Sequence, residues 1–178
     1  MNWRQRSGHP TSPWSPKRKP PSLLLSAGFG RRRSVVPRAE PRFGSVVVLD
    51  PEALSVLAAP KERGVSARRA QAVLVVIERR GGYAIVPAPV LAEASRTRAR
   101  RDAVARVLRR FEVIATDRRI AETAALLLEG AGFDSSNAID AFVVATAAVR
   151  HSAVVLTGDP ADLERLAAPV GNVTVRAL

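Results

Sequence analysis

Short runs of apolar residues alternate with longer segments of helical periodicity from Val46 to Leu178. The first run, residues 46–49, is apolar and mostly β-branched, which is typical of a strand buried on both faces. Further strands are predicted at residues 83–86, 112–115, 153–156 and 173–175. Helices are predicted after residue 50 and over residues 66–80, 89–96, 102–110, 117–129, 135–150 and 159–166, with Ser135 and Ser136 capping the helix over 135–150.

This alternation predicts an α/β fold, a three-layer α/β/α sandwich around a mostly parallel central sheet of four to five strands. In open sheets of this kind, ligands bind beyond the carboxyl ends of the strands. Side chains that directly follow a predicted strand are therefore the first candidates for chemistry.

Residues 1–44 lack this pattern and are predicted to form a disordered basic extension in front of a domain at residues 45–178. The extension contains seven of the 13 prolines, and its one apolar patch, residues 23–25, is too short for a membrane span or a signal-peptide core. We therefore expect a cytoplasmic protein. Two interpretations of the extension stay open: an arm that holds RNA through its phosphates, or an unstructured extension, which includes the case of a start codon assigned too far upstream.

The charge and composition restrict the chemistry of any site. Residues 1–45 carry ten Lys and Arg against one acid, whereas residues 46–178 carry eighteen against fifteen, so most of the net charge of +12 belongs to the extension. Cys is absent and the only histidines are His9 and His151, which excludes thiolate and histidine-rich metal sites. Any metal ion must be held by oxygen, which favours Mg²⁺ or Mn²⁺.

Two aspartates, Asp50 and Asp159, follow predicted strands and are expected at the carboxyl edge of the sheet. Each precedes a proline, and Asp as N-cap with Pro at the first helical position is also a common way to begin a helix. The two roles are compatible, because one carboxylate oxygen can cap the helix while the other faces an ion.

Two further acids, Asp140 and Glu93, lie on predicted helices. Asp140 stands in a segment that is apolar on nearly every face, where an ionised carboxylate is costly unless it is paired or coordinated. A functional carboxylate and a buried ion pair with a distant arginine both explain it. Glu93 has an ordinary surface partner in Arg96, three residues on, so its significance depends on the other acids.

Clustered carboxylates require a cation, because two of them about 4 Å apart repel by roughly 4 kcal/mol at an effective dielectric constant of about 20. A divalent ion turns this repulsion into attraction, lowers the pKa of a bound water and stabilises charge on a phosphodiester oxygen. We hypothesise that Asp50, Glu93, Asp140 and Asp159 converge on one or two Mg²⁺ or Mn²⁺ ions.

The order and spacing of these acids resemble the PIN-domain ribonucleases, especially the VapC-type toxins of toxin–antitoxin modules. The matching stretches, which span residues 46–166, are VVVLDPEALSVL, VPAPVLAEASR, NAIDAFVVATAA and VLTGDPADLERL. The resemblance implies a catalytic and metal-binding role for Asp50, Glu93, Asp140 and Asp159, and endonucleolytic cutting of RNA. It also implies a homodimer and a small antitoxin partner that blocks the acidic groove.

Three other positions bear on the resemblance. Thr157 matches the hydroxyl residue of the fourth motif and is expected to orient a carboxylate or a water. Asp162 matches a further acid there, which we interpret as structural. Pro51 departs from the family pattern, which often has a small hydroxyl residue or Ala after the first Asp, but this departure leaves the four acids in place.

The densest positive region of the domain includes Arg96, Arg98, Arg100 and Arg101, and it is a candidate RNA-binding surface because arginine binds phosphate bidentately. A solvated helix face explains the same run. Aromatic residues are scarce, so base stacking is not indicated.

Two other classes of protein compete with the nuclease. A PIN-fold module that binds RNA or a protein without cutting would keep the same pattern. A phosphate-accepting receiver domain also has Asp at strand ends, but it needs a lysine after the last core strand, and Lys61, the only lysine of the domain, lies in an early loop.

Overall fold

The computed structural model describes residues 46–178, and the predicted extension at residues 1–44 lies outside this range. The strands are β1 (Val46–Leu49), β2 (Tyr83–Pro87), β3 (Glu112–Ile114), β4 (Ala153–Thr157) and β5 (Val173–Ala177). The helices are α1 (Pro51–Ala58), α2 (Gly64–Arg79), α3 (Val90–Ala94), α4 (Arg98–Leu108), α5 (Arg118–Ala131), α6 (Ala138–Ala148) and α7 (Pro160–Ala167), with a 3₁₀ turn at Ser135–Asn137.

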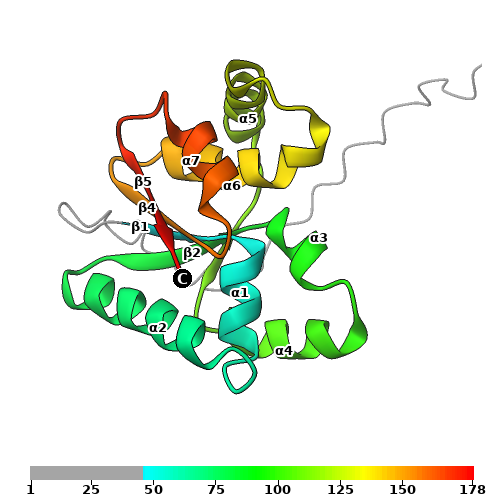
Figure 1. Ribbon diagram of the computed structural model, residues 1–178, viewed down its shortest axis with the longest axis vertical. Coiled ribbons are helices and arrows are strands. Elements are labelled where there is room, and N and C mark those ends of the chain that lie inside the picture. The colour runs from blue at the N-terminus through cyan, green and yellow to red at the C-terminus, as the bar shows by residue number, and fades with distance from the viewer. Residues whose placement is uncertain (1–45) are drawn as a thin grey trace, which may run out of the picture. The chain divides into compact units, whose positions relative to one another are not determined.

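The five strands form one parallel sheet in the order β3-β2-β1-β4-β5. Figure 1 shows α1, α2 and α4 on one side of this sheet and α5, α6 and α7 on the other. The predicted α/β fold, with three layers and a parallel sheet of four to five strands, is therefore confirmed.

The hydrophobic core lies between the sheet and both helix layers. All four residues of β1 are buried, as its apolar, β-branched sequence predicts. Helix α6 also packs on the sheet, and five of its apolar residues have less than 1% of their surface exposed: Ala141, Val143, Val144, Ala145 and Ala147. Helix α6 thereby fixes the position of any side chain in its first turn relative to β1 and β4.

Some predicted helix boundaries were wrong, because the residues that cap these helices differ from those expected from the sequence. Helix α4 starts at Arg98 rather than residue 102, since the Thr97 hydroxyl accepts a bond from the Arg100 N–H at 3.3 Å. Asp134, not Ser135 or Ser136, caps the turn before α6, accepting from the Ser136 N–H at 2.7 Å. Gly132, with φ of +65°, ends α5 in the left-handed conformation.

None of the helices in residues 46–178 combines the length and the apolar character needed to cross a bilayer.

Two neighbouring leucines on α5 provide a test of the core. Leu127 is 6% exposed, whereas Leu126 is 67% exposed. We expect Leu127→Ala to lower the free energy of unfolding by about 2–4 kcal/mol, because it removes buried methyl groups and leaves a cavity. Leu126→Ala, the same change one residue away, should alter it by less than about 0.5 kcal/mol. Urea unfolding followed by circular dichroism measures both, and equal losses would show that α5 is packed differently.

Candidate active site

The carboxyl edge of the sheet between β1 and β4 is where the strand order reverses, because chain connections leave β1 toward β2 and β4 toward β5. Open α/β sheets bind ligands at such a position. The register pairs Leu49 of β1 with Leu156 of β4, and the Asp50 N–H donates to the Leu156 carbonyl at 3.2 Å. The residues that follow these two strands are therefore held side by side.

A pocket of about 480 Å³ opens at this edge. Its lining includes all four predicted acids, Asp50, Glu93, Asp140 and Asp159, together with two more carboxylates, Glu52 and Asp162. Arg100 is the one basic side chain among the lining residues in the described part of the chain. With six carboxylates against one guanidinium, the pocket has a strongly negative formal charge.

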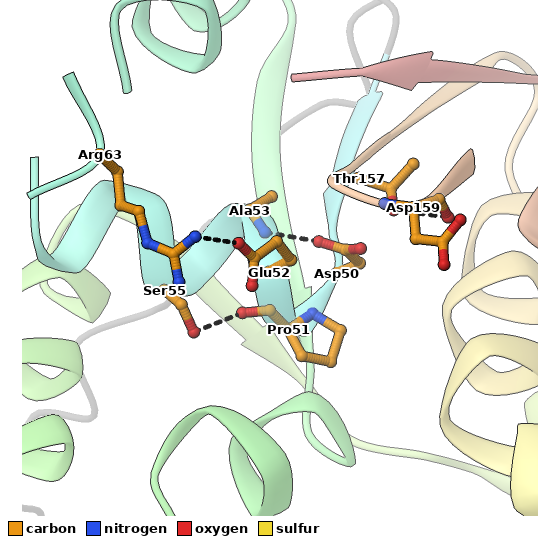
Figure 2. Close-up of polar contacts among 8 residues, drawn as sticks. All are labelled: Asp50, Pro51, Glu52, Ala53, Ser55, Arg63, Thr157 and Asp159. Carbon is orange, nitrogen blue, oxygen red and sulfur yellow. Dashed lines mark hydrogen bonds and ion pairs between the residues drawn. The ribbon is translucent and has the colours of Figure 1, made fainter. Parts of the chain in front are cut away.

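Asp50 lies deepest, with 4% of its surface exposed. One carboxylate oxygen caps α1 by accepting from the Ala53 N–H at 2.6 Å, as Figure 2 shows, so the predicted capping role is confirmed. Burial, together with smaller contributions from the charges of Asp140 and Glu52, raises the pKa of Asp50 from 3.8 to about 6, against the opposing effects of Thr157 and the Ala53 N–H. The capping bond alone therefore does not compensate for the cost of burying this charge.

Thr157 and Asp159 form the other side of the strand junction. The Thr157 side chain is fully buried, and its hydroxyl accepts a hydrogen bond from the Asp159 N–H at 3.0 Å (Figure 2). The same hydroxyl donates to the Asp159 carbonyl at 3.1 Å, and it opposes the rise that burial causes in the pKa of Asp50. Asp159 occupies the N-cap position of α7, but its side chain makes no capping bond. Helix capping therefore explains Asp50 in part and does not explain the Asp159 carboxylate.

Asp140 lies in the first turn of α6 and faces the pocket. It is only partly buried, less than the apolar surroundings in the sequence predicted, because the pocket admits solvent at this end of the helix. Burial raises the pKa of Asp140, and the negative charges of Glu93, Asp162 and Asp159 raise it further. No ion pair within residues 46–178 involves Asp140, so the alternative of a buried pair with a distant arginine is not supported.

Glu93, on α3, keeps its surface partner and also lines the pocket. Its carboxylate lies 3.7 Å from the Arg96 guanidinium, in a pair whose side chains are 43% and 68% exposed. Exposed pairs of this kind contribute little to stability. Glu93 therefore remains available to the pocket, where its charge acts on Asp140.

The four arginines of the predicted RNA-binding surface divide in two. Arg100 lines the acidic pocket, whereas Arg96, Arg98 and Arg101 do not. All four are exposed, Arg96 between α3 and α4 and the others on α4. The sequence could not separate them, because the start of α4 at Arg98, which sets the direction of each side chain, depends on the Thr97 cap.

Two acids of the pocket were not predicted from the sequence to be part of the site. Glu52 was not considered, and Asp162 was interpreted as structural. Each acid lies in the first turn of the helix that follows a strand of the junction, and this position was the available signal. Glu52 also forms an ion pair with Arg63 at 3.0 Å (Figure 2). Its side chain packs so closely against Gly158 that a Cβ there would overlap the Glu52 Cγ, which explains the glycine between Thr157 and Asp159.

The chemistry of these donors fits an oxygen-preferring divalent ion. All are carboxylates, and two of them have pKa values raised partly by their neighbours' charges. Among residues 46–178, no three acidic or histidine side chains are arranged so that they could hold an ion as they stand. Ion binding therefore requires the exposed or half-exposed carboxylates, such as Asp159 and Glu93, to rotate toward Asp50 and Asp140.

Fold and pocket together define an open parallel α/β/α protein with an acidic site at its strand junction. The chain belongs to the PIN domain family, whose model matches residues 47–169. Among solved structures, VapBC2 from Rickettsia felis bound to a DNA fragment from its promoter matches with a TM-score of 0.52 and 17% identity, over 75% of this chain and 98% of that one. VapBC-1 from nontypeable Haemophilus influenzae matches with a TM-score of 0.50 and 14% identity, over 74% and 97%. No curated protein matches the chain in sequence.

Substitution of Gly158 tests the close packing beside the pocket. We expect Gly158→Ala to destabilise the fold by about 1–3 kcal/mol, because the new methyl group must displace the Glu52 side chain at its Cγ. Gly130→Ala is the matched control: it lies inside α5, where an added Cβ would meet no atom within 4 Å, and it should be neutral or slightly stabilising. Thermal unfolding compares the two, and an unchanged midpoint for Gly158→Ala would contradict the packing described.

Neutralising Asp50 should stabilise the protein when no divalent ion is present. Because the folded-state pKa of Asp50 is raised from 3.8 to about 6, the folded state binds more protons than the unfolded state between these pH values. The contribution of Asp50 to the free energy of unfolding is therefore greatest below pH 4. It falls by about 3 kcal/mol in total as the pH rises through 6. Asp50→Asn keeps a cap acceptor and removes the charge, so this loss should disappear.

The measurement is urea unfolding of both proteins in EDTA at pH 4.5 and pH 7.5. The stability advantage of Asp50→Asn should be small at the lower pH and large at the higher one. Asp102→Asn, an exposed change on α4, controls for a general effect of removing an acid. An advantage that is equal at the two pH values would show that the Asp50 carboxylate is not destabilised by burial.

Proposed function

We propose that this protein is a Mg²⁺- or Mn²⁺-dependent endoribonuclease, and that it is the toxin of a toxin–antitoxin module. The observation that carries the proposal is the pocket at the strand junction, where six carboxylates from four parts of the chain lie together and Asp50 and Asp140 have no ion-pair partner within residues 46–178. A partly buried cluster in which Asp50 and Asp140 lack a counter-charge costs folding free energy, and a bound cation would offset that cost.

The proposed ligands are Asp50, Glu93, Asp140 and Asp159. When bound, the metal ion would lower the pKa of a water molecule and stabilise negative charge on the phosphodiester. Thr157 would orient the Asp50 carboxylate or a water molecule, since its buried hydroxyl is held by the N–H and the carbonyl of Asp159 and cannot turn freely. Arg100, at the pocket wall, would attract the RNA phosphates that the acids otherwise repel.

The toxin role is supported by membership of the PIN domain family and by the likeness of the fold to two VapBC toxin–antitoxin complexes. We infer that a small antitoxin blocks the acidic pocket, and that the chain acts in the cytoplasm as a homodimer. These two structures are at most 17% identical to this chain, so they support the fold alone. The antitoxin partner and the homodimer are therefore part of the proposal.

Incubation of the full chain with a mixed RNA pool tests the nuclease directly. We expect cleavage with Mg²⁺ or Mn²⁺ and none with EDTA, and a loss of at least about 100-fold for Asp140→Asn, because this change removes a charged ligand without altering the size of the side chain. Asp102→Asn on α4, outside the pocket, is the matched control and should cleave normally. Expression of the active chain in a bacterial host should arrest growth, and Asp140→Asn should relieve the arrest.

Binding of the RNA pool without cleavage in any metal ion would contradict the enzyme and favour a non-catalytic PIN module. Cleavage that Asp140→Asn leaves unchanged would contradict the assignment of the site.

A further inference from the structure

Asn137 lies at the start of α6, three residues before Asp140, and its side chain does not cap the helix. Asn is among the preferred N-cap residues, because its side-chain oxygen accepts a backbone N–H of the first turn. Asn137 occupies the N-cap position of α6, yet it makes no capping hydrogen bond. Its amide is therefore free of the local helix and directed to other groups.

One of these groups is a carboxylate of another helix. The Asn137 Nδ2 donates to the Asp162 carboxylate of α7 at 3.2 Å, across 25 residues of sequence. Burial raises the pKa of Asp140, which lies one helical turn after Asn137, and the Asn137 amide opposes this rise. Asn137 therefore links the first turn of α6, which carries Asp140, to the acid of α7.

The Asp162 carboxylate fixes which end of the amide faces it, because a carboxylate only accepts hydrogen bonds. The reversed orientation would place the amide oxygen against the carboxylate and lose this bond. At the other end of the amide, the Asn137 Oδ1 accepts a hydrogen bond from the Ser136 hydroxyl at 3.3 Å.

We propose that Asn137 is a positioning residue, which holds Asp162 of α7 beside the first turn of α6 so that Asp162 and Asp140 can both serve a bound cation. This inference rests on the proposed function and adds Asp162 to the acids that act there. An arginine or lysine in this place would neutralise the carboxylates and compete with the ion. A neutral amide donates to Asp162 and leaves the charge of both acids available.

Isothermal titration of the full chain with MnCl₂ tests the inference. Asn137→Ala should weaken Mn²⁺ binding by about 10- to 100-fold, the usual effect of removing a group that orients metal ligands. Ser136→Ala, which removes only the 3.3 Å contact to the Asn137 Oδ1 and leaves the bond to Asp162, should have a smaller effect. Ser135→Ala is the matched control: it lies in the same turn, does not line the pocket, and should bind as the wild type does.

RNA cleavage at two Mn²⁺ concentrations separates positioning from a general effect on folding. If Asn137 positions metal ligands, Asn137→Ala loses activity at limiting Mn²⁺ and regains most of it at saturating Mn²⁺. A general folding defect would not be restored in this way. The double variant Asn137→Ala with Asp162→Asn should bind Mn²⁺ no more weakly than the more affected single variant, because the two groups act through one contact.

Two results would overturn the inference in distinguishable ways. If the wild type binds Mn²⁺ and cleaves RNA while Asn137→Ala, still folded, binds within twofold of it, the positioning role is wrong and the proposed function stands. If the wild type binds no Mn²⁺, both are wrong.

Discussion

The repulsion among carboxylates at one edge of the sheet is the constraint on which the functional interpretation depends. Parallel strands β1 and β4 bring Asp50 and Asp159 to the same edge, and helices α3, α6 and α7 add Glu93, Asp140 and Asp162. A protein selected only for stability would not keep these charges together, since a buried or partly buried carboxylate without a cation is unfavourable. The fold tolerates the cluster because the apolar core around β1 and α6 stabilises the elements that carry it.

The contacts of the cluster divide it into fixed and movable parts. Asp50 is held by the Ala53 N–H, and beside it the Thr157 hydroxyl is held by the N–H and the carbonyl of Asp159. Asn137, one turn before Asp140 on α6, holds the Asp162 carboxylate of α7. Asp159 is exposed and its side chain caps no helix, and Glu93 has only a loose surface partner. Asp50 and Asp162 are therefore fixed by hydrogen bonds, whereas the Asp159 and Glu93 side chains are free to rotate toward a ligand.

Much of this architecture could be predicted from the sequence. The buried strands were evident from their apolar, β-branched runs, and the positions of Asp50 and Asp159 followed from the strands that precede them. Contacts between distant segments could not be predicted, such as the Asn137 bond to Asp162 or the closeness of Glu52 to Gly158, because they depend on how helices pack rather than on local pattern. The start of α4 was missed because the Thr97 cap outweighed the charged, weakly periodic sequence that follows it. The disordered extension at residues 1–44 stays a prediction from composition alone.

The most direct test of a cation site at the strand junction is where Mn²⁺ binds in solution, since this paramagnetic ion broadens the NMR signals of nearby amides. We expect sub-stoichiometric Mn²⁺ to broaden amides at the carboxyl edge, such as those of Gly158 and Ala141, and to spare Val46 and Val173 at the amino ends of β1 and β5. Uniform broadening, or none at the carboxyl edge, would contradict such a site.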